Sequence, residues 1–276
     1  MNTFRTHTLR LLLLLLCVAL ACPYAEARDK KKKAHESQEY GFVHPDKAAN
    51  LYKAVPDSHP RQPKLTNSLS VTYISGNHQY GIDVSHYQGR IDWKSVSTDN
   101  KVGYVYLKAT ESNYMVDDTY EYNLTEARRH GLKVGSYHFF RPNVDAESQF
   151  LNFKRTVDRR KQDLLPLIDV EVTGGVPVAT LHKRLQEFLR LVTKEYGKRP
   201  MIYTGRNFYD RYFAGYSHFK SYIFMIAQYT SGEPSLSDGK DFAMWQFTAK
   251  GRVNGIRGDV DRSRFVGRHS IHEILF

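Results

Sequence analysis

Short apolar segments with strand character alternate with helical patterns along most of this chain, and that alternation constrains the fold more than any other feature. Helical patterns are expected at 91–96, 118–130, 145–160 and 181–196. Strands are expected at 79–84, 103–109, 133–139, 166–172, 201–204, 221–228, 242–247 and 260–262. Alternation of this kind is typical of strands that run parallel and are joined by helices.

The segment 181–196 is the clearest helix, because its apolar residues fall on one face of a 3.6-residue period and Gly197 follows them. Too little sequence separates the last few strands for long helices. We therefore predict an α/β fold, a modified (β/α) barrel of about eight strands with helices missing between the last strands. The alternative is an open doubly wound sheet, but 84–89 contains one glycine and lacks the phosphate-binding pattern of that fold.

The N-terminal residues 1–27 have the pattern of a signal peptide. Arg5 and Arg10 precede an apolar run at 11–21, and small residues at Ala25 and Ala27 suit cleavage. The run is shorter than the roughly 20 residues that a membrane-spanning helix needs. We expect an exported protein, periplasmic or extracellular. Acylation of Cys22 is the alternative, which would make the protein a membrane-anchored lipoprotein.

Residues 28–75 are expected to form a basic linker that contains several prolines, and 76–276 to form the catalytic domain. The whole chain has a formal charge of +11, from 40 Lys and Arg against 29 Asp and Glu. A positive balance fits an anionic partner but does not identify it. No basic and aromatic nucleic-acid motif accompanies the charge, so we expect no nucleic-acid partner.

Four acidic residues lie on predicted strands, namely Asp83, Asp169, Glu171 and Asp261. Alternate residues of a strand face the same side, so Asp169 and Glu171 should project together. Two carboxylates in one low-dielectric pocket cannot both ionise easily, so one of them can donate a proton near neutral pH. Glycoside hydrolysis needs such a donor together with a second, negative group. A metal site is the alternative, but no metal-binding histidine spacing accompanies the acids, and we expect neither metal nor cofactor.

Aromatic and amide side chains on the same strands could bind a sugar, because flat rings stack on pyranose faces and polar heads bond to hydroxyl and acetamido groups. The alternative for the aromatic residues is ordinary filling of the barrel. The predicted substrate-binding residues are Tyr137, Phe139, Tyr203, Gln228, Trp245, Gln246 and Glu111.

Several motifs of the chain resemble, in order and in approximate spacing, those of glycoside hydrolase family 25, the N,O-diacetylmuramidase lysozymes. The matching segments are 83–89 (DVSHYQG), 91–93 (IDW), 108–112 (KATES), 135–139 (GSYHF), 169–171 (DVE), 202–204 (IYT), 245–247 (WQF) and 260–261 (VD). One departure is Ser263, where the family more often has Asn.

The resemblance implies a lysozyme that cleaves the β-1,4 bond between N-acetylmuramic acid and N-acetylglucosamine in peptidoglycan. It implies that Glu171 is the general acid and that Asp169 assists the acetamido group of the substrate, with Asp83 and Asp261 in supporting roles. It leaves open whether the anomeric configuration is retained or inverted. The alternatives are a non-catalytic peptidoglycan-binding module on the same fold and a hydrolase of another amino-sugar glycan.

Overall fold

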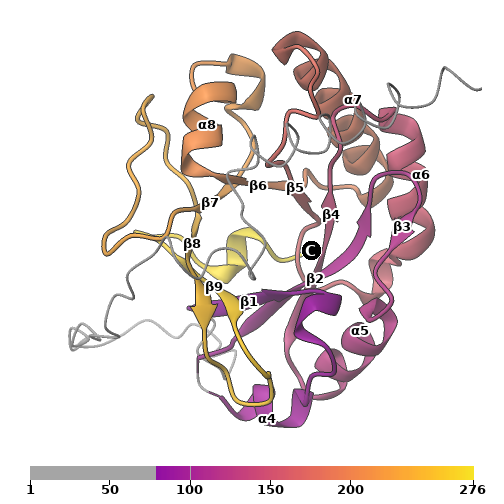
Figure 1. The fold of residues 1–276 in the computed structure, drawn as a ribbon, viewed down its shortest axis with the longest axis vertical. Helices are drawn as coiled ribbons and strands as arrows, with labels where there is room; N and C mark the ends of the chain where they lie inside the picture. The colour runs from indigo at the N-terminus through magenta and orange to yellow at the C-terminus, as the bar shows by residue number, and fades with distance from the viewer. Residues whose placement is uncertain (1–78, 100) are drawn as a thin grey trace, which may run out of the picture. The chain divides into compact units, whose positions relative to one another are not determined.

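The computed structural model describes residues 79–99 and 101–276, so the predicted signal peptide and the whole of the predicted linker lie outside the described residues. Eight strands form a closed barrel, since the first and last of them pair with each other (Figure 1). Around the ring they are β1 (Tyr80–Val84), β2 (Tyr104–Glu111), β4 (Lys133–Phe139), β5 (Leu167–Asp169), β6 (Met201–Gly205), β7 (Phe224–Ala227), β8 (Met244–Gly251) and β9 (Val260–Phe265). A ninth strand, β3 (Met115–Val116), pairs with β2 outside the ring.

The strands from β1 to β8 pair in parallel around the ring, whereas β9 is antiparallel to both of its neighbours. The predicted modified (β/α) barrel is thus confirmed, with a hairpin in place of the last crossover. The hairpin has a consequence for the acids. Asp261 is near the beginning of β9 and pairs in register with Asp83, near the end of β1. Both acids therefore lie at the carboxyl end of the parallel strands.

Helices connect the strands as far as β7. They are α4 (Trp93–Thr98), α5 (Tyr120–Arg129), α6 (Ala146–Thr156), α7 (Val178–Tyr196) and α8 (Arg206–Tyr212), with 3₁₀ turns at His86–Gln88, Arg159–Lys161, Ser217–Phe219 and Ile271–Glu273. Between β7 and β9 the described chain contains no helix. No helix among the described residues has both the length and the apolar character needed to cross a membrane.

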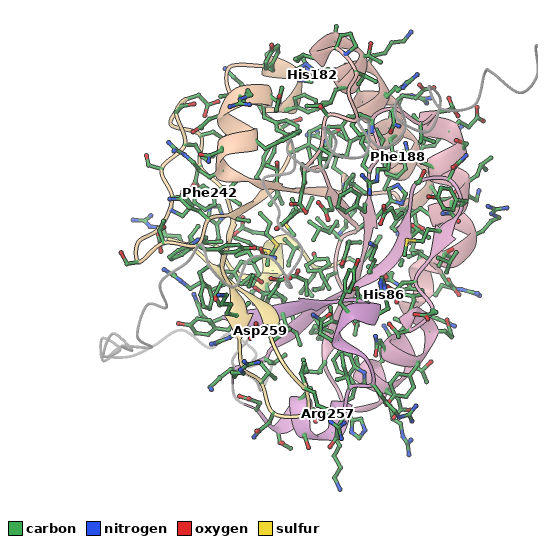
Figure 2. All side chains as sticks on the ribbon, in the orientation of Figure 1. His86, His182, Phe188, Phe242, Arg257 and Asp259 are labelled. Atoms are coloured by element: carbon green, nitrogen blue, oxygen red, sulfur yellow. The ribbon has the colours of Figure 1, made fainter. Side chains whose placement is uncertain are left out.

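Helix α7 shows how the sequence encodes this architecture. Its apolar residues Leu181, Leu185 and Phe188 are fully buried against the sheet. Gly197 ends the helix in a left-handed conformation with φ of 76°, which glycine adopts without steric cost. Phe188, labelled in Figure 2, stacks on the ring of His138 from β4 with centroids 4.8 Å apart.

The apolar core has two layers, one between the strands and the helices and one inside the barrel. The inner layer includes Tyr104, Tyr106, Met201 and Phe265. The chain after β9 closes the amino end of the barrel, since the backbone of Leu165, just before β5, donates to the carbonyl of Ile274. The carboxyl end is thus left for polar side chains.

Several predicted boundaries differ from the structure. The strand expected at 166–172 covers only Leu167–Asp169; Val170 still donates its N–H to the carbonyl of Tyr203 on β6, and the chain then leaves the sheet. The strand expected at 260–262 continues to Phe265 by pairing with both β1 and β8. The helix expected at 145–160 ends at Thr156 and is followed by a 3₁₀ turn.

Candidate active site

Asp169 and Glu171 form a carboxyl pair at the carboxyl end of β5. Their side chains share a hydrogen bond, which requires that the pair carries one proton. Burial, and then the charge of Glu171, hold the pKa of Asp169 well above its usual range. Burial also raises the pKa of Glu171 to about 7, although the hydrogen bond from Asp169 lowers it. The pair can therefore hold and release a proton near neutral pH.

Asp169 has one further feature. Its side chain is 7% exposed, and its Oδ1 atom has no hydrogen-bond partner among the described residues. A buried acceptor without a donor is costly in a folded protein. This oxygen is therefore suited to receive an N–H donor from a ligand.

Asp83 and Asp261 form a second carboxyl pair across the β1–β9 ladder, and their side chains also share a hydrogen bond. Burial raises the pKa of Asp83 to about 6 and that of Asp261 well above its usual range. The charge of Asp83 also raises the pKa of Glu171. The two pairs therefore lie within electrostatic reach of each other.

Gln246 of β8 is a hydrogen-bonding centre of the site and is 1% exposed. Its Nε2 donates to both carboxylate oxygens of Asp83 at 3.0 Å. Its Oε1 accepts from the hydroxyl groups of Tyr203 at 2.9 Å and Tyr229 at 2.8 Å. The two tyrosines thus fix the orientation of the amide, which in turn stabilises the ionised form of Asp83.

Tyr137 of β4 lies close to the acids. Burial holds the pKa of its hydroxyl well above the usual range, and the charges of Asp83, Asp169, Asp261 and Asp117 raise it further. Tyr137 and Tyr203 both pack against the inner layer of the core. Both tyrosines therefore stay neutral; the hydroxyl of Tyr203 donates to Gln246, and the hydroxyl of Tyr137 lies near the carboxyl pairs.

Two cations lie within electrostatic reach of the Asp169–Glu171 pair and share one acid, Glu111. Nζ of Lys108 donates to Oε2 of Glu111 at 2.7 Å, and Arg141 donates to Oε1 of Glu111 from Nε at 3.0 Å and from Nη2 at 2.6 Å. The centroid of the Phe139 ring lies 5.5 Å from the Lys108 nitrogen and 4.6 Å from the Arg141 guanidinium carbon. The predicted substrate-binding residues Glu111 and Phe139 are thus engaged by these cations.

Trp245 and Gln228 lie differently from the other predicted residues. Trp245 belongs to the outer core layer, and its Nε1 donates to the backbone carbonyl of Gln228 at 2.7 Å. It alternates with Gln246 along β8, so the structure places its ring on the opposite face of the strand from the carboxyl pairs. Oε1 of Gln228 is buried without a hydrogen-bond partner in the described part of the chain.

Two functional candidates were not predicted from the sequence, Tyr229 and Arg141. Tyr229 follows β7 and binds Gln246, and Arg141 follows β4 and binds Glu111. Both are polar residues directly after the carboxyl end of a strand. That position, in a barrel of this kind, is the signal that could have identified them.

One group among the described residues could hold a metal ion, formed by His86, Asp117 and Asp118, whose ligand atoms all lie within 4.8 Å of one another. His86 is labelled in Figure 2. Oδ2 of Asp117 accepts from the backbone and ring nitrogens of His86, at 3.0 and 2.7 Å, and Oδ1 accepts from Thr119. The protein itself thus satisfies Asp117, and the arrangement is explained without an ion.

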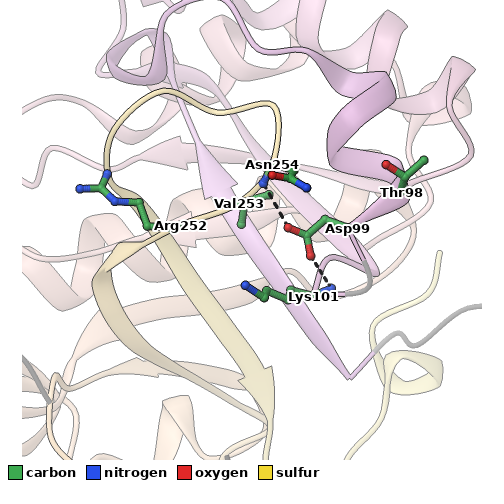
Figure 3. Close-up of a pocket in the computed structure, with 6 residues that line it drawn as sticks. All are labelled: Thr98, Asp99, Lys101, Arg252, Val253 and Asn254. Carbon is green, nitrogen blue, oxygen red and sulfur yellow. Dashed lines mark hydrogen bonds between the residues drawn. The ribbon is translucent and has the colours of Figure 1, made fainter. Parts of the chain in front are cut away.

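A pocket of about 480 Å³ lies apart from the predicted site residues, between the end of α4 and the loop that joins β8 to β9 (Figure 3). The carboxylate of Asp99 accepts from the backbone nitrogens of Lys101 at 3.0 Å and Asn254 at 3.1 Å. None of the four acids lines it. The lining residues are Thr98, Asp99, Lys101, Arg252, Val253 and Asn254.

The sequence model of the family described as Glycosyl hydrolases family 25 matches residues 82–256, a range that covers more than half of the chain. The chain belongs to glycosyl hydrolases family 25. The match includes three of the four acids, and Asp261 follows it. A barrel with a carboxyl pair at the end of β5 thus agrees with membership of a glycoside hydrolase family.

Named relatives include both an uncharacterized protein and a lysozyme. The chain is 39% identical over 192 residues to the uncharacterized protein YegX of Escherichia coli (strain K12), covering 68% of this chain and 70% of the relative. It is 30% identical over 199 residues to Lysozyme M1 of Streptomyces globisporus, covering 68% of this chain and 67% of the relative. Among solved structures, the bacterial lysozyme of Streptomyces coelicolor superposes with a TM-score of 0.62 at 29% identity, covering 71% of this chain and 94% of that one.

Proposed function

We propose that this chain is an exported lysozyme that hydrolyses the β-1,4 bond between N-acetylmuramic acid and N-acetylglucosamine in peptidoglycan. The observation that carries the proposal is the hydrogen-bonded pair of Asp169 and Glu171 at the carboxyl end of β5. Membership of family 25 supports glycoside hydrolysis, and the lysozymes of the two Streptomyces species support the substrate class.

Glu171 is proposed as the general acid. A pKa raised to about 7 by burial keeps a proton available near neutral pH. Glu171 gives that proton to the glycosidic oxygen as the bond between this oxygen and the anomeric carbon breaks. It then accepts a proton from the water that completes the hydrolysis.

Asp169 is proposed to act on the substrate acetamido group. Its unpartnered Oδ1 can accept the acetamido N–H, which orients the acetamido carbonyl oxygen toward the anomeric carbon. The hydrogen bond between Asp169 and Glu171 brings their oxygens closer than the roughly 5 Å or more that separates an independent acid and nucleophile. The pair therefore supports attack by the substrate's own carbonyl oxygen, with retention of configuration.

Asp83 and Asp261 are proposed to support the charge of the reacting centre, because they lie opposite each other at the same end of the barrel. Gln246 holds Asp83 in its ionised form, and the hydroxyl of Tyr137 is available to a sugar hydroxyl or acetamido group.

Mass spectrometry of the muropeptides released from purified peptidoglycan tests this proposal, with Glu171→Gln and Asp169→Asn beside the unchanged protein. We expect new reducing-end muramic acid from the unchanged protein, none from Glu171→Gln, and strongly reduced amounts from Asp169→Asn. New reducing-end glucosamine would contradict the proposed bond. A folded protein that binds peptidoglycan and releases no product would show a binding module instead.

A further inference from the structure

A bridge of three charged side chains borders the Asp169–Glu171 pair. Glu111 accepts from Lys108 at one carboxylate oxygen and from Arg141 at the other, the closest contacts being 2.7 and 2.6 Å. The Lys108 side chain is 8% exposed, that of Glu111 17% and that of Arg141 30%. At this depth, charges are less screened by solvent than at the surface. The three groups together carry one net positive charge.

The backbone of Arg141 is fixed by a buried amide of α6. Oε1 of Gln149 accepts from the Arg141 backbone nitrogen at 2.8 Å, and Nε2 of Gln149 donates to the Arg141 carbonyl at 3.0 Å. Gln149 is fully buried, and its Oε1 also accepts from Nε2 of His138 at 3.3 Å. The position of the guanidinium thus depends on contacts that lie behind the sheet.

Phe139 adds a second restraint, because its ring contacts both cations. The contact of a cation with an aromatic face stabilises the cation. Lys108 and Arg141 thus share two partners, the ring of Phe139 and the carboxylate of Glu111.

We propose that Arg141 is a positioning residue of the reaction: by binding Glu111 it prevents this acid from cancelling the Lys108 charge, so that a net positive charge faces Asp169 and Glu171. This inference rests on the proposed function. Without Arg141, Glu111 and Lys108 form a neutral pair. With it, the bridge favours the ionised member of the carboxyl pair by electrostatic attraction. The charges of Lys108 and Arg141 both lower the pKa of Glu171, which agrees with this arrangement.

The other groups that face the carboxyl pair oppose this effect or leave it unchanged. The charge of Asp83 raises the pKa of both members of the pair, and Glu171 in turn raises that of Asp261. The tyrosines around the pair are neutral, since burial raises their pKa values well above the usual range. The facing groups are Asp83 on β1, Lys108 and Glu111 on β2, Tyr137 on β4, Arg141 after β4, Tyr203 on β6, Tyr229 after β7 and Asp261 on β9.

The test compares Arg141→Gln, Arg141→Lys and Glu111→Gln in the full chain. The bridge has no net charge in the first variant, one positive charge in the second and two in the third. We expect the basic limb of the pH profile of kcat/KM, which reports the loss of the Glu171 proton, to move upward by about half a unit to one unit in Arg141→Gln. This limb should return in Arg141→Lys and move downward in Glu111→Gln.

Arg128→Gln is the matched control. Arg128 pairs with Asp163 at 3.1 Å, and its side chain is 35% exposed, but Asp163 precedes β5 at the amino end of the barrel. The control removes one positive charge from the protein without touching the bridge. Its profile should stay in place.

A second measurement does not require activity. Carbon-13 NMR of labelled carboxyl groups should show the Glu171 titration moving upward in Arg141→Gln, even for a protein that cleaves no peptidoglycan. If the unchanged protein has no activity, the proposed function fails while this titration still tests Arg141. An unmoved basic limb together with an unmoved Glu171 titration in Arg141→Gln would overturn the inference, whether or not the variant keeps its activity.

Discussion

Replacement of Gln246 by leucine isolates the hydrogen bonds that stabilise ionised Asp83. The amide donates to both oxygens of Asp83 at 3.0 Å, and leucine has a similar volume but no donor. Hydrogen bonds to a charged acceptor contribute about 1.5–3 kcal/mol, which corresponds to about one to two pKa units. Burial already holds the pKa of Asp83 at about 6, so the variant should carry a protonated Asp83 at neutral pH.

The assay is the pH dependence of kcat/KM on purified peptidoglycan. We expect the acid limb of the profile to move upward by about one to two units, with about tenfold lower kcat/KM for each unit at pH values below the limb. The variant also leaves the buried hydroxyl of Tyr203 without its acceptor, which should cost about 1–3 kcal/mol of unfolding free energy.

Gln162→Leu is the control for loss of a buried amide. Gln162 is 8% exposed; it accepts from Ser136 at 2.8 Å and donates to Tyr120 at 3.4 Å, and it makes no contact with the four acids. It should lower thermal stability and leave the acid limb in place. An unmoved limb in Gln246→Leu, or an equal movement in both variants, would refute the reasoning.

Three further predictions concern Asp83, Gly81 and Leu185. Asp83→Asn should raise the melting temperature at pH 7 and not at pH 4. The pKa of Asp83 is about 6 in the folded protein against the usual 3.8, so the wild-type carboxyl stabilises the fold at low pH and loses this contribution as the pH rises from about 4 to about 6. Equal changes in melting temperature at both pH values would count against this. Gly81→Ala should cost about 1–3 kcal/mol in denaturant unfolding, since its Cβ would overlap the ring of Tyr104, and a neutral result would show that the Tyr104 ring moves freely. Leu185→Ala, at a fully buried position of α7, should cost about 2–5 kcal/mol while the pH profile of activity stays in place, and a moved profile would show that α7 acts on the site.

The fold was predictable from the sequence because the periodic pattern carried most of the information. The period of apolar residues in 181–196 identified α7, and the alternation of strands and helices identified the barrel. The direction of β9 was not predictable, because no periodicity distinguishes a hairpin from a crossover in 248–259. The structure shows that β9 pairs with β1 and β8 in the antiparallel direction.

The site was predictable where it depends on spacing within one strand and not where it depends on barrel closure. Alternate positions on one predicted strand indicated the pairing of Asp169 with Glu171, although β5 ends at Asp169 and Glu171 lies two residues beyond it. The register of Asp83 with Asp261 and the binding of Arg141 to Glu111 join residues far apart in the chain. Such contacts follow from strand order, which local patterns do not contain. Alternation along β8 puts Trp245 and Gln246 on opposite faces, but the sequence does not tell which of the two faces the carboxyl pairs. That required knowledge of which face of β8 lies inside the barrel.

The proton shared by Asp169 and Glu171 is the central claim of this account, and carbon-13 NMR of their carboxyl groups measures it directly. Chemical shifts followed from pH 3 to pH 9, with Glu171→Gln to assign the signals, should show one step near the pKa of about 7 for Glu171 and one well above the usual range for Asp169. Two independent steps below pH 5 would contradict the account, because both carboxyl groups would then be ionised at neutral pH and neither could donate a proton to a glycosidic oxygen.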